Sequence, residues 1–195
     1  MSTQARKERE RAERHQRIID TARELAECSG WEAVTVRKLA ERIEYSQPVL
    51  YSHFAGKQAI VSAVAEQGCA VLAETLRAAR ESAATPAAAC GNLARAYLAF
   101  AVDNPARYDA MFVMKTDLAF GPDAPQALRD AFGEFEALFR DAFTGAELAA
   151  RTELAWCCVH GIATLDRAGR LVPALRDQRL AVLIDEWRTA IGQPS

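Results

Sequence analysis

Apolar residues recur at helical spacing along most of this chain, and no segment shows the strict alternation of a strand. The pattern predicts an all-α fold of about nine helices. Long amphipathic helices are expected from about His15 to Gly30 and from Lys57 to about Arg80. Beyond a cap at Thr85, further helices are expected at 86–104, in a short segment from 105, and at 126–143, 147–171 and 177–191, with a loop at 121–125.

A pair of short helices is predicted between the first two long ones, over residues 35–57. Thr35 can cap the first with its side-chain oxygen, and Glu44 falls in the turn. Ser46 can cap the second, with Pro48 in its first turn, where the missing N–H of proline costs nothing. Two such short helices cannot bury a core alone, so they must rest on the longer helices to either side.

The second short helix should leave polar side chains on its outer face: Gln47, Tyr51, Ser52 and His53. Glutamine can bond adenine, arginine can fork onto guanine, and tyrosine, histidine and lysine can donate to phosphates. Spacing alone leaves two interpretations open, a DNA-reading helix-turn-helix and an ordinary solvated helical hairpin.

Three segments of this region, Thr35 to Ala40, Ser46 to Phe54 and Gly56 to Lys57, together resemble the DNA-binding domain of the TetR family of bacterial repressors. The resemblance implies that Arg37 and Gln47 reach base edges and that Pro48 and Val49 touch thymine methyl groups. It also implies phosphate contacts by Thr35, Tyr51, His53 and Lys57.

The turn departs from the family pattern, because this chain has Glu44 where family members commonly have glycine. A non-glycine residue with positive φ costs roughly 1 kcal/mol. We therefore expect either a strained Glu44 or a different turn. A carboxylate beside DNA can also lower affinity.

The chain has 195 residues, half of them hydrophobic, which is enough for one or two domains with a sizeable core. We predict a DNA-binding domain at residues 1–60 and a ligand-binding and dimerisation domain at 61–195. The net charge is −2, but residues 1–60 carry 11 Lys/Arg against 9 Asp/Glu, so the charge of this part is +2. An acidic total does not exclude DNA binding, because the local potential of the presented face decides it.

The basic N-terminal run has two interpretations. Arg6, Lys7, Arg9, Arg11, Arg14 and Arg17 alternate with acidic residues. They fit the solvated start of a helix or a basic arm along a minor groove.

Membrane and export signals are not apparent in the sequence. The N-terminus lacks an apolar signal region, and no uncharged apolar stretch approaches the ~20 residues that span a bilayer. We expect a cytoplasmic protein without a membrane partner. Its five cysteines lack paired metal-ligand spacing, so they are expected to be reduced and mostly buried, and neither a metal nor a cofactor is predicted.

Specific reading of DNA usually needs two heads about 34–36 Å apart, which favours a homodimer on a palindromic operator. The last two predicted helices carry apolar stripes that could simply be core. The resemblance to the TetR family implies instead that these helices, within 147–191, form a four-helix dimer interface, with Gly161 permitting close approach. The residues assigned to this interface are Leu154, Cys158, Gly161, Ile162, Leu165, Leu180, Leu183, Ile184 and Trp187.

Aromatic residues and methionines gather in the middle and later parts of the chain, where such clusters are more often core than pocket. The family resemblance implies a small-molecule cavity there, and Asn104 to Tyr108 with Trp156 to Gly161 resembles the subtype with a Trp-x-x-x-His-Gly signature. His160 would be a polar group of the pocket or a helix-packing histidine. An apolar or aromatic effector is expected, with this lining: Tyr97, Phe100, Tyr108, Met111, Phe112, Phe135, Phe139, Trp156 and His160.

These features predict a transcriptional regulator. The resemblance alone implies that it represses. A bound ligand is expected to act on the DNA-binding domain through the helix from Lys57 to Arg80. Cys157, Cys158 and His160 raise an enzymatic alternative, but no third catalytic partner or nucleotide-binding loop accompanies them, so no catalytic residue is assigned. A redox-sensing regulator using Cys157 and Cys158 is a second alternative. A helical protein-interaction module is a third.

Overall fold

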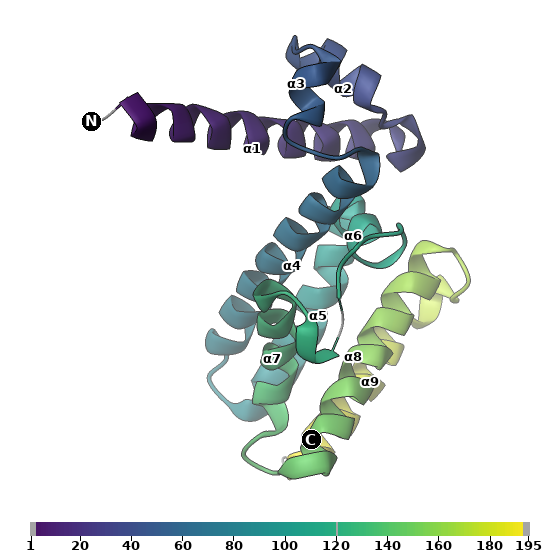
Figure 1. Cartoon of the computed structure of the whole chain (residues 1–195). Coiled ribbons are helices and arrows are strands. Elements are labelled where there is room, and N and C mark those ends of the chain that lie inside the picture. The colour runs from purple at the N-terminus through teal and green to yellow at the C-terminus, as the bar shows by residue number, and fades with distance from the viewer. Residues whose placement is uncertain (1–2, 120, 193–195) are drawn as a thin grey trace. The chain divides into compact units, whose positions relative to one another are not determined.

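The computed structural model describes residues 3–119 and 121–192, so the outermost ends of the two predicted domains lie outside the described residues. Within these ranges the chain forms nine α-helices and no strand (Figure 1). The predicted all-α class is confirmed. Short 3-10 helices lie at Trp31–Ala33, Gly121–Asp123 and Pro173–Leu175.

The described residues divide into two compact units, and the division does not follow a single cut in the chain. The first unit holds the residues up to Gly68 together with Asn104–Asp123. The second holds Cys69–Asp103 and the residues from Ala124 onward. The chain thus passes from the first unit to the second inside helix α4 (Lys57–Glu81). A domain boundary at residue 60 stays a prediction.

Helix α1 (Thr3–Ser29) is longer than the amphipathic pattern that predicted it. Its second half buries Ile18, Ile19 and Ala22, and the helix ends before Gly30, whose φ of 75° suits glycine. The first half is mostly exposed and carries the basic run. This run is therefore helical, and its contact with a minor groove stays a prediction.

The two short helices form as predicted, α2 at Val36–Ile43 and α3 at Gln47–Tyr51. The hydroxyl oxygen of Thr35 accepts a 3.2 Å hydrogen bond from the Lys38 amide, which confirms the predicted cap. Glu44 adopts a left-handed conformation with φ 58°, so this residue takes the positive φ that glycine favours. Ser46 precedes α3, but its side chain makes no capping bond there, so this part of the prediction is wrong.

Helix α6 (Pro105–Phe112) packs on the first unit although it follows α5 (Pro86–Asp103) in the chain. The indole N–H of Trp31 donates to the Ala106 carbonyl at 2.9 Å. A Cβ added at Gly68 on α4 would lie 2.7 Å from the sulfur of Met111 on α6. The absence of a side chain at Gly68 therefore allows α4 and α6 to approach closely.

The second unit is built from α5, α7 (Gln126–Phe139), α8 (Gly145–Arg167), α9 (Arg176–Ala190) and the later part of α4. Phe135 and Phe139 of α7 meet the indole of Trp187 edge-on, at 6.4 and 6.3 Å between ring centroids. The α7 carboxylate of Glu134 accepts hydrogen bonds from the α4 residues Arg77 and Arg80, at 3.1 and 2.7 Å. The core of this unit is therefore aromatic, with an ion-paired edge.

Two predicted helix bounds in this unit differ from the structure. Helix α7 ends at Phe139 and not at residue 143, because Phe143 lies in the following loop, where its ring packs against the Arg151 guanidinium at 3.9 Å. Helix α8 ends at Arg167, and Gly169 follows with a φ of 65°.

Helix α4 is, among the described residues, the one helix long and apolar enough to cross a membrane by length and composition. Half of its apolar window is buried inside the protein, and one such helix is weak evidence for a membrane span.

Candidate nucleic-acid interface

Helix α3 presents a polar and aromatic outer face. Leu50 points inward and is buried, whereas Gln47, Pro48 and Tyr51 are exposed. Tyr51 leaves 55% of its surface accessible, which is unusual for a large ring that carries only one polar atom. Val49 is half-buried. The face can therefore offer an amide, a phenol and two apolar side chains to one ligand surface.

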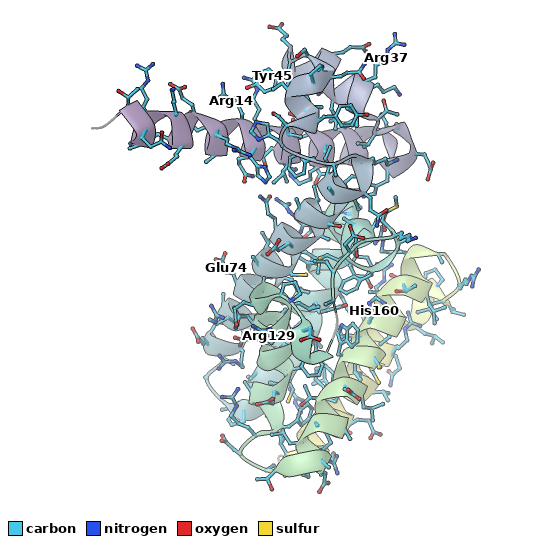
Figure 2. The ribbon with its side chains drawn as sticks, viewed as in Figure 1. Arg14, Arg37, Tyr45, Glu74, Arg129 and His160 are labelled. Carbon is cyan, nitrogen blue, oxygen red and sulfur yellow. The ribbon has the colours of Figure 1, made fainter. Side chains whose placement is uncertain are left out.

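Arg37 extends from α2 into solvent (Figure 2). Its Nε donates to the Glu41 carboxylate at 2.9 Å, and this hydrogen bond raises the pKa of the guanidinium. A forked contact to guanine through the two Nη nitrogens is compatible with that bond. Glu41 was not among the predicted site residues, although its spacing of four residues from Arg37 is a recognisable signal for helical pairing.

Thr35 and Lys57 both have partners inside the first unit. The Thr35 oxygen caps α2, which leaves its hydroxyl hydrogen able to donate to a phosphate. The Lys57 ammonium donates to the Trp31 carbonyl, and two of its three N–H donors remain for other acceptors. Each side chain can therefore combine a structural bond with a phosphate contact.

His53 follows α3 and is half-buried beside α1. Its ring centroid lies 5.9 Å from that of His15, which in turn stacks on Phe54 at 4.3 Å. Burial lowers the pKa of His53, and the positive charges of His15, Arg11 and Arg14 lower it further. Nothing in the sequence pattern identifies His15 as part of this site, because its contact with His53 depends on the packing of α1 on the helix-turn-helix.

The turn between α2 and α3 also meets α1. The guanidinium of Arg17 lies over the ring of Tyr45, 5.7 Å from its centroid. Figure 2 shows Arg14 and Tyr45 in the region where α1 and this turn come together. The first unit therefore contains both the basic side chains of α1 and the residues predicted to read DNA.

The residues predicted to bind an effector are divided between the two units. Tyr97, Phe100, Phe135 and Phe139 are buried in the second unit, with Trp156 and His160 half-buried there. Tyr108, Met111 and Phe112 belong to the first unit, where the rings of Tyr108 and Phe112 meet edge-on at 4.9 Å.

The Tyr97 hydroxyl and the Nδ1 atom of His160 are 3.1 Å apart. The His160 ring also lies 5.5 Å from that of Trp156, and burial lowers its pKa. This polar contact among aromatic rings fits both interpretations of His160, since either a pocket group or a packing histidine needs a hydrogen-bond partner.

Two cavities open on the surface of the second unit, with volumes of about 630 and 410 Å³. The larger is lined by α5 and α9 residues, among them Arg95, Asp185 and Arg188. The predicted effector residues line neither of these two cavities. An effector site among the aromatic residues therefore stays a prediction.

Most residues assigned to a dimer interface remain at least partly accessible: Leu154 and Leu165 are exposed, and Cys158, Gly161, Ile162, Leu180 and Leu183 are half-buried. Ile184 and Trp187 are each only 5% accessible, and Trp187 packs on the α7 phenylalanines. A place for these two residues in a dimer interface stays a prediction. The α9 residue Val182, exposed at 53%, was not predicted.

The cysteines are less buried than expected. Cys69 and Cys90 are buried and Cys158 is half-buried, but Cys28 and Cys157 are exposed. Burial raises the pKa of the Cys158 thiol, and Cys157 raises it further. Within residues 3–119 and 121–192, no three His, Cys, Asp or Glu side chains are placed to hold a metal ion.

Two family models match this chain. Residues 18–64 match bacterial regulatory proteins of the tetR family, and residues 90–187 match the tetracyclin repressor-like C-terminal domain. The first match contains α2 and α3, and the second contains most of the second unit.

Curated relatives match parts of the chain. Tetracycline repressor protein class C of Escherichia coli is 49% identical over 49 residues, which are 25% of this chain and 22% of that protein. YobS, an uncharacterized HTH-type transcriptional regulator of Bacillus subtilis (strain 168), is 32% identical over 100 residues, or 51% of this chain and 52% of YobS. The chain thus spans between about a fifth and about half of the length of these two relatives.

Solved structures share the fold over most of the chain. A protein of unknown function from Rhodococcus sp. RHA1 aligns with a TM-score of 0.74 and 24% identity, covering 93% of this chain and 95% of that one. A TetR-family transcriptional regulator from Streptomyces coelicolor aligns with a TM-score of 0.63 and 16% identity, covering 93% and 99%. At these identities the likeness shows a common fold.

Proposed function

The chain belongs to the TetR family of bacterial regulatory proteins and is a transcriptional regulator, and from this premise we propose that it is a repressor that binds a palindromic operator as a homodimer. The observation that carries the proposal is the exposed face of α2 and α3, with Arg37, Gln47 and Tyr51 accessible together in one unit. We assign it to a major groove.

Base reading is proposed for the side chains nearest the groove. Arg37 forks onto guanine O6 and N7, and Gln47 bonds adenine N6 and N7. Pro48 and Val49 contact thymine methyl groups. Phosphates are held by Thr35, Tyr51, His53 and Lys57, which fix the register of the head on the duplex without reading sequence.

Dimerisation is proposed through α8 and α9. Leu154 is 63% accessible and Leu165 is 41% accessible on α8, and Val182 is similarly exposed on α9. Two copies that bury these faces around a two-fold axis would present two heads to successive turns of the groove.

A small, largely apolar effector is proposed to bind among the aromatic residues of the second unit and to release the operator. Tyr97 and His160 supply polar groups in that region. The Trp-x-x-x-His-Gly subtype is part of this proposal. Helix α4 is continuous between the units, so an effector that favours a different separation of the two heads shifts the population away from DNA. A coupling of about 1–3 kcal/mol suffices. We place the regulator in the cytoplasm.

The first test is fluorescence anisotropy on DNA flanking the protein's own gene, with a salt series. Arg37→Ala should weaken binding by about 1–3 kcal/mol and relax specificity at one position, whereas Tyr51→Ala should weaken binding to all sequences alike. Arg140→Ala removes one exposed charge from the second unit and serves as the matched control. The proposal would be contradicted if competitor DNA abolished binding and Arg37→Ala had no effect, both on this DNA and on duplexes recovered from a random-sequence selection with this protein.

Thiol sensing is a second candidate because Cys157 is exposed on α8. The raised pKa of Cys158 opposes it, since a protonated thiol is a poor nucleophile. Alkylation of the folded protein distinguishes the two functions: a sensor should lose or change operator binding, and unchanged binding would remove this candidate.

A further inference from the structure

We propose that α1 and the turn after α3 together form a backbone-phosphate site, made by Arg11, Arg14, His15 and His53, that takes up a proton when DNA occupies it. The inference rests on the proposed DNA-binding function and adds to it a regulation by pH. It also assigns a role to α1 that the helix-turn-helix resemblance does not contain.

The two histidines are held side by side by the packing of α1. The His15 ring lies nearly parallel to that of Phe54, with an interplanar angle of 21° and 4.3 Å between centroids. Phe54 is only 7% accessible, so this stack rests on the core of the unit. The backbone N–H of His53 donates to the Leu50 carbonyl at 3.0 Å, which fixes His53 at the end of α3. The 5.9 Å between the imidazoles is therefore set by buried neighbours.

The charges that act on His53 from α1 are all positive. Arg11 and Arg14 are exposed, and they lie one turn and one residue before His15. Glu10 on the same helix is paired with Arg6 at 3.2 Å. Tyr51 and Lys57 flank His53 along its own segment. Burial and then the charges of His15, Arg11 and Arg14 lower the pKa of His53. A cluster of positive charges of this kind favours an anionic ligand.

A phosphate reverses the balance at His53. In the unbound protein the neighbouring cations and burial favour the neutral imidazole. A bound phosphate cancels part of that repulsion and accepts a hydrogen bond from the imidazolium, so the pKa is higher in the complex than in the free protein. The complex then holds more protons, and operator affinity falls as the pH rises between the two pKa values.

Histidine is the side chain whose ordinary pKa places this change near neutral pH. The chain has three histidines, and two of them lie in this cluster. The arginines and Lys57 keep their charge throughout that range. A pH dependence of binding near neutrality therefore reports on His53.

The experiment measures anisotropy at constant ionic strength between about pH 6 and about pH 8. The probe is a duplex recovered from a random-sequence selection with this protein. We expect the affinity of the wild type to fall about tenfold over this range, the effect of one pKa unit. His53→Gln should lose most of this dependence. His15→Gln should reduce it, because one of the charges that lower the pKa of His53 is then absent. His53→Lys should bind without the dependence and more tightly than His53→Gln at the upper pH, because its charge does not titrate there.

Lys7→Gln is the charge control, since it removes a positive charge from α1 without removing a titrating group near neutral pH. It should keep the wild-type pH dependence. Calorimetry in buffers of low and high ionisation enthalpy should show proton uptake on binding by the wild type and less by His53→Gln. Thermal unfolding of each variant verifies that it is folded.

Specific binding by the wild type without pH dependence would overturn the proton-linked site and leave the proposed regulator intact. The same outcome follows if both histidine variants keep the full dependence. An absence of sequence-specific binding would overturn the proposed function and this inference together.

Discussion

Glu41 shows how one residue can act on DNA recognition through another. Its carboxylate accepts the Arg37 Nε–H at 2.9 Å on an exposed helix face. A surface ion pair of this kind contributes little to stability, so its main effect is on the orientation of Arg37. In a DNA complex the same negative charge would oppose nearby phosphates. We therefore expect Glu41 to favour selectivity at some expense of affinity.

Two substitutions separate these effects. Glu41→Gln keeps an oxygen for Nε and removes the charge, so we expect several-fold tighter binding to all DNA with the base preference retained. Glu41→Ala removes both, so it should bind DNA more tightly and discriminate less at the base that Arg37 contacts. Anisotropy on the operator and on single-base variants measures both. If Glu41→Ala keeps the full base preference, Glu41 does not orient Arg37.

Glu44 is the one described non-glycine residue with a positive φ, 58°. Glu44→Gly should raise the free energy of unfolding by about 0.5–1 kcal/mol, because the relieved left-handed strain exceeds the added chain entropy. Urea unfolding gives the value. Ala12→Gly, on an exposed turn of α1, is the control and should lower stability by up to about 1 kcal/mol. A less stable Glu44→Gly would show that the carboxylate has contacts that outweigh the strain.

Some local residue features could be predicted, and partnerships across helices could not. The Thr35 cap depends on a few neighbouring residues and was predicted correctly, whereas the Ser46 cap was wrong and the conformation of Glu44 was left open between two possibilities. The His15 contact with His53 and the Lys57 bond to the Trp31 carbonyl depend on how α1 packs. No periodicity specifies such a contact.

At the scale of helices, Gly68 sets the approach of α4 to α6. Gly68→Val should lower the free energy of unfolding by about 1–3 kcal/mol, because the new side chain overlaps Met111. The double variant with Met111→Ala should recover part of the loss. Gly133→Val is the matched control, because a Cβ at this α7 position would meet nothing within 4 Å. Equal losses at positions 68 and 133 would show that packing at Gly68 is not limiting.

Helix bounds were predicted best where proline or a cap marks them. Thr85 accepts the Ala88 amide at the start of α5, and α6 begins at Pro105. The end of α7 was missed because Phe143 continues the apolar pattern while its ring serves a loop contact with Arg151. Apolar spacing does not distinguish the two uses of a phenylalanine.

At the scale of the whole molecule, the apolar face of α8 is expected to join two copies. Leu154→Glu should raise the dimer dissociation constant at least about tenfold, because a charge would be buried without a partner, and operator affinity should fall with it. Sedimentation velocity and anisotropy measure the two effects. Val102→Glu, at a residue 65% accessible on α5, is the matched control and should leave the dimer intact. If Leu154→Glu dimerised with the wild-type dissociation constant, the α8 face would be excluded as the dimer interface.

Fold class followed from periodicity because helical spacing runs through most of the chain. Assignment of helices to units did not. Segment Asn104–Asp123 belongs to the first unit, and Trp31 bonds to Ala106 across 75 positions of sequence. The aromatic residues predicted to form one pocket are divided for the same reason, since Tyr108 and Met111 lie on that returning segment.

This returning segment has a consequence for recombination. A hybrid regulator made by a single crossover near residue 60 would join one parent's Trp31 to the other parent's α6, and the bond to the Ala106 carbonyl would then depend on a mismatched pair. Exchange of heads between relatives should succeed more often when residues 104–123 are inherited with the N-terminal part. We therefore expect that two separate stretches of the gene must be exchanged together to transfer DNA recognition.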